Sequence, residues 1–287
     1  MKKNRFLFIT AITALALAVS CKTPPGSSSR PQLFDESPQR TRSGPELRVI
    51  FSPQYFSPDG DKEELAIYLF AVDEYPIDKW SIEIREPQPP YPLFYQWEGE
   101  GHPPETLRWN GRSRSGELVQ SALDYPFVFT ASNSQGNTSS IETVIEVDVI
   151  VLKEGSNLRI QIPSIVFRSN SSTWDGLDDD IVDSNYWILQ RLAQILNKFG
   201  DYRINVEGHA NPTANPDDRA AWLREQEQEL KPLSESRAKK IVDELVMLGI
   251  NPGRLSYYGL GGERPLVRWE DTDNWWKNRR VEFLLIK

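Results

Sequence analysis

The sequence predicts an α+β protein with two folded domains, an all-β sandwich followed by a β-α-β-α-β-β domain. Residues 45–154 hold short alternating runs of β-type residues between turn-rich segments, whereas residues 155–287 hold two stretches of helical periodicity between strands. A chain of 287 residues suits two domains better than one, because a domain usually has about 100–200 residues. The change of pattern near Gly155 sets the predicted boundary.

Residues 1–20 are predicted to be a signal peptide. Lys2, Lys3 and Arg5 give a positive start, and residues 6–19 form an apolar stretch that ends just before Cys21, the only cysteine. This stretch is shorter than the ~20 residues that a membrane-spanning helix needs. With one cysteine, an intrachain disulfide is impossible.

Residues 17–21, Leu-Ala-Val-Ser-Cys, resemble the lipobox of bacterial lipoproteins. The resemblance implies that Cys21 is acylated, becomes the new N-terminus and anchors the chain in a membrane. Lys22 in place of Asp implies the outer membrane, by the enterobacterial sorting pattern. The alternative is an ordinary cleaved leader followed by a free thiol. Residues 21–44 are rich in Pro, Ser and Gly with few apolar side chains, which predicts a disordered tether.

The first folded domain, residues 45–154, is predicted from its alternation of apolar and polar residues, which is clearest from Trp80 to Arg85. Strands at this spacing are typical of a small β-sandwich. The predicted strands are residues 47–51, 65–72, 80–85, 125–132 and 141–152.

Two motifs in this domain carry a resemblance. Residues 56–61 read Phe-Ser-Pro-Asp-Gly-Asp and residues 109–111 read Trp-Asn-Gly, with Tyr-Pro-Phe at residues 125–127. The segment resembles the immunoglobulin-like domains of flagellar hook-cap (FlgD) and gliding-motility type proteins. The resemblance implies a spacer, or a module through which envelope proteins bind.

Acidic residues in the first of these motifs raise the question of calcium, which prefers oxygen ligands. Pro-Asp-Gly is ordinary turn chemistry, and the ligand spacing of an EF-hand loop is missing. We therefore predict no metal site. The acidic residues are Asp59, Asp61, Glu63 and Glu64.

The second domain, residues 155–287, alternates strands with helices. A strand at residues 159–167 precedes a helix that begins at Asp183 or Ser184 and ends at Gly200, and a second helix runs from Ser234 to Gly249. This order predicts helices packed on one face of a small mixed sheet. The remaining predicted strands are residues 203–209, 255–258 and 281–286.

Five segments of this domain carry a family resemblance. They are Val-Glu-Gly-His-Ala-Asn at residues 206–211, Leu-Ser-Glu-Ser-Arg-Ala at 233–238, Leu-Gly-Ile-Asn to Arg-Leu at 248–255, Tyr-Gly-Leu-Gly at 258–261 and Asn-Arg-Arg-Val-Glu-Phe at 278–283. In this order they resemble the OmpA C-terminal domain. The resemblance implies non-covalent binding of peptidoglycan without catalysis.

The resemblance also suggests a binding site for the peptidoglycan stem peptide. A free diamino-acid end presents an ammonium and a carboxylate, so a receptor needs an acid and an arginine. Arg237 takes the family's arginine position, but Asn211 replaces the Asp of the family's Gly-His-Thr-Asp motif, and Arg168 stands where a second Asp is common. The candidate binding residues are Asn211, Arg237, His209, Arg168, Ser234 and Arg280.

Each candidate also has a structural alternative. In this alternative, His209 is a structural histidine held by hydrogen bonds. Arg237 is a solvated arginine at the start of a helix, and Arg280 is a residue that caps the last strand. The long segment from Pro212 to Pro232 offers Asp217 and Asp218 to restore the missing charge, or Trp222 to cover the pocket. The tryptophans at positions 269, 275 and 276 suit packing, although aromatic faces also stack on sugar rings.

Charge and composition limit the function. The chain has 33 Lys and Arg against 41 Asp and Glu, a formal net charge of -8, which disfavours nucleic acid as a partner. No nucleophile–base pair or metal cluster is visible, so we predict neither an enzyme nor a cofactor. The leading prediction is a lipid-anchored protein of the outer membrane that faces the periplasm and binds peptidoglycan. The alternative is an envelope scaffold on the same fold that has lost wall binding and acts through protein contacts.

Overall fold

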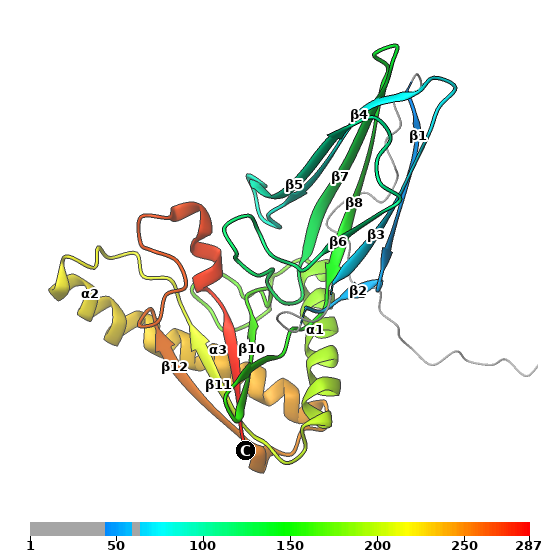
Figure 1. Ribbon diagram of the computed structural model, residues 1–287. Coiled ribbons are helices and arrows are strands. Elements are labelled where there is room, and N and C mark those ends of the chain that lie inside the picture. The colour runs from blue at the N-terminus through cyan, green and yellow to red at the C-terminus, as the bar shows by residue number, and fades with distance from the viewer. Residues whose placement is uncertain (1–43, 59–63) are drawn as a thin grey trace, which may run out of the picture.

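The computed structural model describes residues 44–58 and 64–287. The predicted signal peptide, Cys21 and the tether lie outside the described residues, as do Asp59, Asp61 and Glu63. Among the described residues, no helix has the length and apolar character that crossing a membrane requires. Figure 1 shows strands in the N-terminal half of the chain and a mixture of strands and helices in the C-terminal half.

Two mostly antiparallel sheets make up the N-terminal half. One has the strand order β1-β3-β6 and the other has the order β2-β8-β7-β4-β5. The strand bounds are β1 Glu46–Ser52, β2 Tyr55–Phe56, β3 Leu65–Val72, β4 Ile77–Arg85, β5 Leu93–Glu100, β6 Thr106–Trp109, β7 Asp124–Asn133 and β8 Thr138–Val147. The strands β2, β5 and β6 carry no clear alternation in the sequence, because they are short or interrupted by polar residues.

The two sheets share one apolar core, because alternate residues of each strand point inward. Ile67 of β3 and Ile82 of β4 are fully buried in it. The two sequence motifs meet at its edge, where the ring centroids of Phe56 and Trp109 lie 5.7 Å apart. A Cβ on Gly111 would lie 3.0 Å from the Phe56 ring, so the Trp-Asn-Gly turn packs directly on the Phe-Ser-Pro segment.

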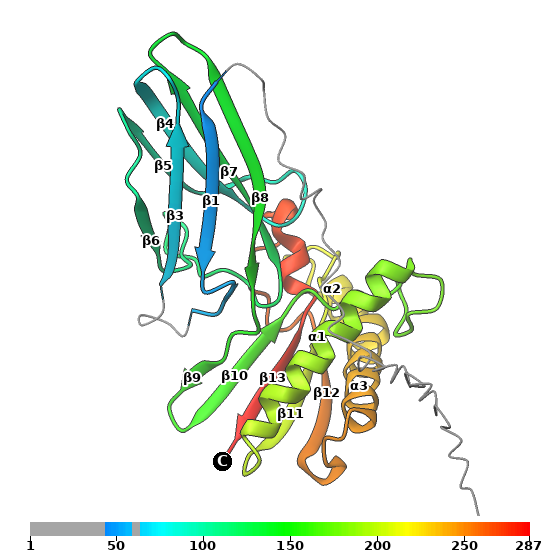
Figure 2. The same ribbon diagram turned by 90° about the vertical axis from the view of Figure 1, so that its right-hand side faces the viewer.

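The C-terminal half is built on a five-stranded mixed sheet. Its order is β12-β11-β13-β10-β9, with β11 and β12 parallel and the other neighbours antiparallel. The helices α1 and α3 pack on one face of it, as the sequence predicts (Figure 2). The bounds are β9 Leu152–Glu154, β10 Asn157–Ile162, α1 Asp179–Lys198, β11 Arg203–His209, α2 Arg219–Glu225, α3 Lys231–Met247, β12 Leu255–Gly261 and β13 Val281–Ile286.

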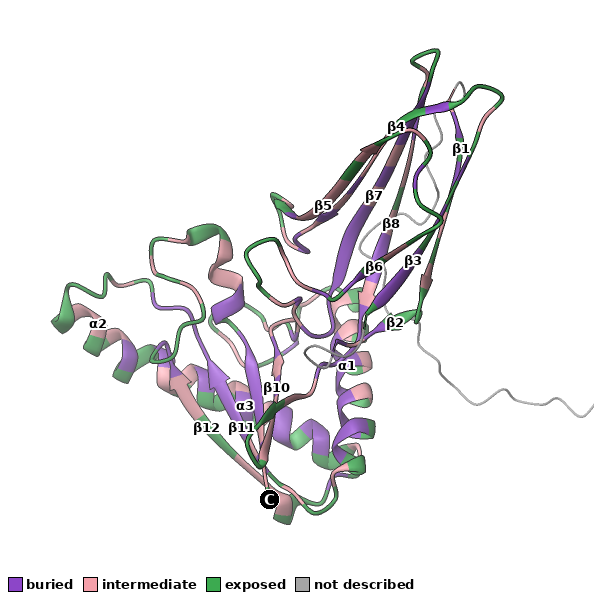
Figure 3. Cartoon of the chain, viewed as in Figure 1, coloured by how far each residue is buried: buried purple, intermediate pink, exposed green. Residues whose placement is uncertain are grey.

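Helix α1 begins at Asp179, ahead of the predicted start at Asp183 or Ser184. Acidic side chains in the first turn interact favourably with the helix dipole, so this N-terminus extends beyond the apolar repeat. Its buried stripe faces the sheet, and Figure 3 shows the alternation of buried and exposed residues along the helix. The buried apolar residues are Ile188, Leu189, Leu192, Ala193, Ile195 and Leu196.

Helix α3 is preceded by more helix than the sequence predicts. The helix α2 continues through a π-helical turn, η1 Gln226–Leu230, into α3, so the predicted start at Ser234 lies inside a long helical segment. Gln226 fixes the π-helical turn, since its side chain is buried and its Oε1 accepts a hydrogen bond from Gly262 N at 2.8 Å. The second helical segment therefore begins with α2, which buries none of its residues and so has no buried apolar stripe for the sequence to reveal.

The start of α3 contacts the sheet backbone directly. A Cβ on Gly208 would lie 2.0 Å from Ser234 O, and one on Gly259 would lie 2.3 Å from Lys231 O. Only glycine permits this approach. The two glycines thus explain the Gly-His and Tyr-Gly-Leu-Gly motifs, and they fix the position of every side chain on the first turns of α3.

Buried charges join the two halves of the chain. Lys277, in the 3-10 helix η3 Thr272–Asn278, donates to Glu86 Oε1 at 3.0 Å and to Glu117 Oε1 at 2.7 Å, and both acids belong to the N-terminal half. On α1, Arg191 Nε donates to Asp148 Oδ1 at 2.8 Å. Because β9 pairs with β10, the chain changes sheets within residues 148–155, and we propose that the two domains meet there.

Candidate functional site

Arg237 lies in the second turn of α3 and faces the loop between β10 and α1. Its Nε donates to Ser171 O at 2.9 Å, and its guanidinium carbon lies 5.2 Å from the centre of the Phe167 ring. A second nitrogen donates to Arg168 O at 3.4 Å. Arg237 is therefore held by backbone carbonyls and an aromatic face, and no acid within residues 44–58 and 64–287 pairs with its positive charge.

A second arginine shares this environment. Burial lowers the pKa of Arg237, and the charge of Arg279 lowers it further. Arg279 is exposed, and its partial desolvation lowers its pKa. Among the described residues, no ion pair joins either arginine to a carboxylate. Guanidinium groups that no described carboxylate neutralises favour a carboxylate or another anion as a ligand.

Ser234, another predicted site residue, has a structural role. Its side chain is fully buried, donates from Oγ to Lys231 O at 3.1 Å and accepts from Gly261 N at 2.9 Å. Both hydrogen-bonding directions of the hydroxyl are therefore occupied. Ser234 attaches α3 to the end of β12 and so positions Arg237 one turn later.

The side chain of Asn211, which stands at the family's acid position, also makes hydrogen bonds within the chain. It follows the end of β11, is buried, and accepts a hydrogen bond from Asn278 Nδ2 at 2.7 Å on its Oδ1. Its own Nδ2 donates to Pro212 O at 2.9 Å. Asn278 in turn accepts from Leu266 N and Val267 N. The amide at position 211 thus joins three loops, and its neutral oxygen already accepts one hydrogen bond.

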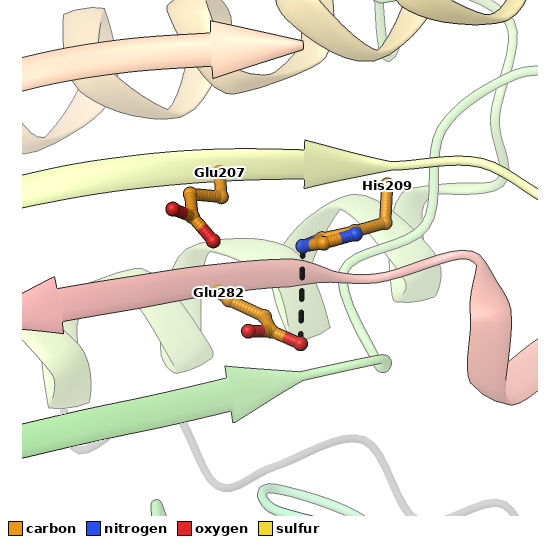
Figure 4. Close-up of side chains that lie close together, drawn as sticks. All are labelled: Glu207, His209 and Glu282. Carbon is orange, nitrogen blue, oxygen red and sulfur yellow. Dashed lines mark ion pairs between the residues drawn. The ribbon is translucent and has the colours of Figure 1, made fainter. Parts of the chain in front are cut away.

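His209 and Arg280 lie on the opposite face of the sheet from the helices. Side chains alternate along β11 and β13, so the apolar Val206 and Phe283 face α1 and α3, while Glu207, His209 and Glu282 gather on the other side (Figure 4). Arg280 Nε donates to Glu282 Oε1 at 2.6 Å. The predicted residues are therefore split between two faces of one sheet.

His209 is neutral in this cluster. Burial, reinforced by the charge of Arg280, lowers its pKa from 6.5 to about 3. Neither ring nitrogen has a hydrogen-bond partner among the described residues, and Nε2 lies 3.8 Å from Glu282 Oε1, beyond hydrogen-bonding distance. Among the described residues, His209 therefore lacks the hydrogen bond to a neighbouring loop that the structural alternative predicts.

The ligand atoms of Glu207, His209 and Glu282 all lie within 4.8 Å of one another, a separation that a metal ion allows. The surrounding charge opposes a cation, because arginines already hold both carboxylates. Arg159 pairs with Glu282, and Arg264 NH1 lies 3.4 Å from Glu207 Oε2. Although burial opposes its charge, Arg280 holds the pKa of Glu282 below its ordinary value. These contacts form a structural ion network across β10, β11 and β13.

Among the described residues, the side chains of Arg168, Asp218 and Trp222 make no hydrogen bond to Arg237 or Arg279. Arg168 is exposed and contributes its carbonyl, not its side chain, to Arg237. In the segment after Asn211, Asp218 caps α2 by accepting from Ala221 N at 3.0 Å. The Trp222 ring lies 4.4 Å from the guanidinium of Arg219, so it packs on its own helix.

Sequence reasoning missed Arg279 and Asn278 as functional candidates. It weighed them as residues that cap the last strand and selected Arg280 from the same motif. The alternation of Val281, Phe283 and Leu285 already predicts that residue 279 shares the face of the helices and that residue 280 does not. The hydrogen bonds of Asn278 leave no such pattern in the sequence, because they depend on the positions of two loops that are distant in the chain.

Comparison with known proteins agrees with this architecture. Residues 178–279 match the OmpA family. A peptidoglycan-associated lipoprotein of Mesorhizobium japonicum is 38% identical over 93 residues, which is 32% of this chain and 49% of that protein. Motility protein B of Helicobacter pylori is 27% identical over 132 residues, 46% of each chain.

A third relative, the peptidoglycan-binding protein ArfA of Mycobacterium tuberculosis, is 29% identical over 105 residues, 37% of this chain and 29% of that protein. The chain thus spans less than half the length of these curated relatives. Among solved structures, the periplasmic domain of Helicobacter pylori MotB has 21% identity and a TM-score of 0.38, covering 48% of this chain and 78% of that one. Through residues 178–279, the C-terminal half of this chain is an OmpA-like domain.

Proposed function

We propose that this protein binds peptidoglycan non-covalently through its OmpA-like domain and tethers the outer membrane, by a lipid on Cys21, to the cell wall. The observation that carries the proposal is the arginine pair of Arg237 and Arg279, which lacks an acidic partner among the described residues. Arg237 occupies the family position for the stem-peptide carboxylate. Two of the relatives are named for peptidoglycan association or binding.

The two arginines bind one end of the stem peptide in this proposal. A carboxylate accepts hydrogen bonds from both guanidinium groups and relieves their mutual repulsion. The ammonium end has no carboxylate to meet at Asn211, whose oxygen accepts from Asn278. We therefore infer that the site recognises the carboxylate of the stem peptide and contributes less to recognition of the ammonium.

Co-sedimentation with purified sacculi from the source organism tests wall binding. Truncating one partner of a buried charged pair costs ~2 to 5 kcal/mol. At ~1.4 kcal/mol per decade, Arg237→Ala should therefore weaken binding by roughly thirtyfold or more. Arg203→Ala is the matched control, because Arg203 is exposed at the other end of β11. Equal binding by both variants would contradict the proposed site.

The lipid anchor rests on the lipobox-like sequence that ends at Cys21. Several acyl chains give stable anchoring, since each buried CH₂ contributes ~0.8 kcal/mol. Cells fed a palmitate analogue should label the wild type and leave Cys21→Ala unlabelled. Equal labelling of the two proteins rules the anchor out.

The N-terminal domain is proposed to be an immunoglobulin-like spacer that also contacts envelope proteins. Two sheets around one core, and the contact between Phe56 and Trp109 from its two motifs, support this assignment. An exposed apolar group on the outer face of β1 and β3 suits a protein contact. Its members are Ile50, Tyr68, Phe70 and Val72.

A scaffold that has lost wall binding is the second candidate. The observation that favours it is the neutral, hydrogen-bonded Asn211 together with the exposed Arg168 in place of a second acid. Failure of the wild type to bind sacculi or any soluble wall fragment would select the scaffold. Capture of the same partners by the wild type and by Arg237→Ala would support it further.

A further inference from the structure

An open hollow of about 670 Å³ lies between the loop after β11 and the loop before η3. We propose that it binds an N-acetylated amino sugar of the glycan chain, beside the stem-peptide site. This inference rests on the proposed function, since it names the second component of the same polymer. The residues that line the hollow are Pro216, Arg268, Trp269, Glu270 and Asp271.

The indole of Trp269 is held in place before any ligand arrives. Its Nε1 donates to Thr213 O at 3.3 Å, and its ring centroid lies 6.4 Å from that of Trp275. The Trp275 Nε1 donates in turn to Trp269 O at 2.9 Å. A fixed, partly exposed aromatic face loses little conformational entropy on binding and suits the C–H face of a sugar ring.

Polar side chains surround this aromatic face. Among the described residues, Arg268 and Glu270 make no side-chain hydrogen bond or ion pair, so their groups are available to a ligand. Asp271 accepts from Asn274 Nδ2 at 3.0 Å and retains lone pairs for a further donor. A guanidinium and two carboxylates match the hydroxyl and acetamido groups around a sugar ring, and their mixed charge favours a neutral ligand over an anion.

The hollow is tied to the arginine pair through Asn278. Asn278 accepts from Leu266 N at 2.7 Å, which fixes the start of the Trp269 loop, and it donates to Asn211, which precedes the Pro216 loop. The next residue is Arg279, whose charge acts on Arg237. Through Asn278, the loop that carries Trp269 is thus connected to the residue beside Arg279, and the open form of the hollow allows a polymer to pass.

Titration of the full chain with the tetramer of N-acetylglucosamine tests the inference, because this probe has sugar but no peptide. The chain contains 9 Trp, so nitrogen-15 labelling of tryptophan gives a small set of indole signals, of which Trp269→Phe identifies one. We expect the tetramer to shift the Trp269 signal and a soluble stem peptide to leave it unchanged. Trp269→Ala should weaken tetramer binding at least tenfold.

Further variants separate this site from the peptide site and from unfolding. Arg268→Ala and Glu270→Ala remove unpaired side chains and should each weaken tetramer binding while leaving the melting temperature unchanged. Trp97→Ala, in β5, is the control and should bind normally. Arg237→Ala should lose the peptide and keep the tetramer.

The outcomes are distinguishable. Absence of any tetramer binding, or equal binding by wild type and Trp269→Ala, overturns the sugar site even if sacculi still bind. Tetramer binding without sacculus binding overturns the wall-tether proposal and leaves the sugar site standing. Tetramer-induced shifts confined to tryptophans of the N-terminal domain likewise overturn the assignment.

Discussion

Asn278 Nδ2 donates to Asn211 Oδ1 at 2.7 Å, and both side chains are buried. The family's acid position is thus occupied by an amide whose partner sits in the motif that also supplies Arg279. This contact joins the loop after β11 to the loop before β13. Asn278 also accepts a hydrogen bond from Leu266 N, which precedes Trp269 in the chain, and Arg279 is the residue that follows Asn278.

Removing this junction should be costly. Asn278→Ala leaves Asn211 Oδ1, Leu266 N and Val267 N without their partner, and an unsatisfied buried polar group costs about 1–3 kcal/mol. Urea denaturation measures the loss. Asn274→Ala, in the same 3-10 helix, breaks only a contact with Asp271 and should change the free energy of unfolding less. Similar losses in the two variants would contradict the role of Asn278.

Restoring the missing acids should change ligand preference. Asn211→Asp with Arg168→Asp adds two carboxylates, which suit the ammonium of a diaminopimelate end, so affinity for such muropeptides should rise. The same change turns a carboxylate toward Pro212 O, which now accepts from the amide, so stability should fall by about 1–3 kcal/mol. Calorimetric titration measures the affinity, and thermal unfolding measures the stability. Unchanged affinity in the double variant argues against a muropeptide site at these positions.

His209 should make stability depend on pH. The pKa of His209 is about 3 in the folded chain, whereas its ordinary value is 6.5. Between these two pH values, the unfolded chain therefore binds a proton that the folded chain does not bind. Above about pH 6.5, protonation of His209 takes nothing from the free energy of unfolding. As the pH falls toward 3, the free energy of unfolding decreases by up to about 1.4 kcal/mol per pH unit.

Chemical denaturation between about pH 6.5 and pH 4 measures this slope. His209→Gln should flatten it, because glutamine does not titrate. His102→Gln removes the only other histidine and is the control. A slope that survives in His209→Gln assigns the proton to another group.

Lys277 should hold the two domains together. Its side chain is 3% exposed, and although burial opposes its charge, Glu117 and Glu86 raise its pKa. Lys277→Met leaves Glu86 buried without a counter-charge and should cost about 3–5 kcal/mol. Glu117→Gln is milder, since Glu117 is 40% exposed, and should cost below about 1 kcal/mol. Equal losses of unfolding free energy in Lys277→Met and Glu117→Gln, measured by calorimetry, would show that the difference in burial between Glu86 and Glu117 has no effect.

Gly208 should tolerate no side chain. A Cβ there would lie 2.0 Å from Ser234 O, so Gly208→Ala has to move α3 away from the sheet, at about 1–3 kcal/mol or more. Gly200→Ala is the matched control, since the nearest atom to its Cβ would be 3.9 Å away. Thermal unfolding of both variants checks the difference. Displacement of α3 should also weaken sacculus binding, because it moves Arg237.

The sequence alone determined that the N-terminal half consists of strands and that the C-terminal half combines strands with helices. The alternation from Trp80 to Arg85 predicts a strand that forms within β4, and the apolar repeat from Ile188 to Leu196 predicts the buried face of α1. The motifs around Gly208 and Arg237 identify the OmpA-like domain, which the family match confirms. Such features rest on local periodicity and on residues close together in the chain, which a sequence displays directly.

Tertiary structure decided which side chains meet. It separates His209 and Arg280 from Arg237 by a whole sheet, brings Arg279 to Arg237, and occupies Asn211 with Asn278. It also places Lys277 against Glu86, 191 residues away in sequence. These contacts depend on the paths of irregular loops and on the packing of distant elements, and neither leaves a periodic pattern in the sequence because no repeating backbone geometry underlies them.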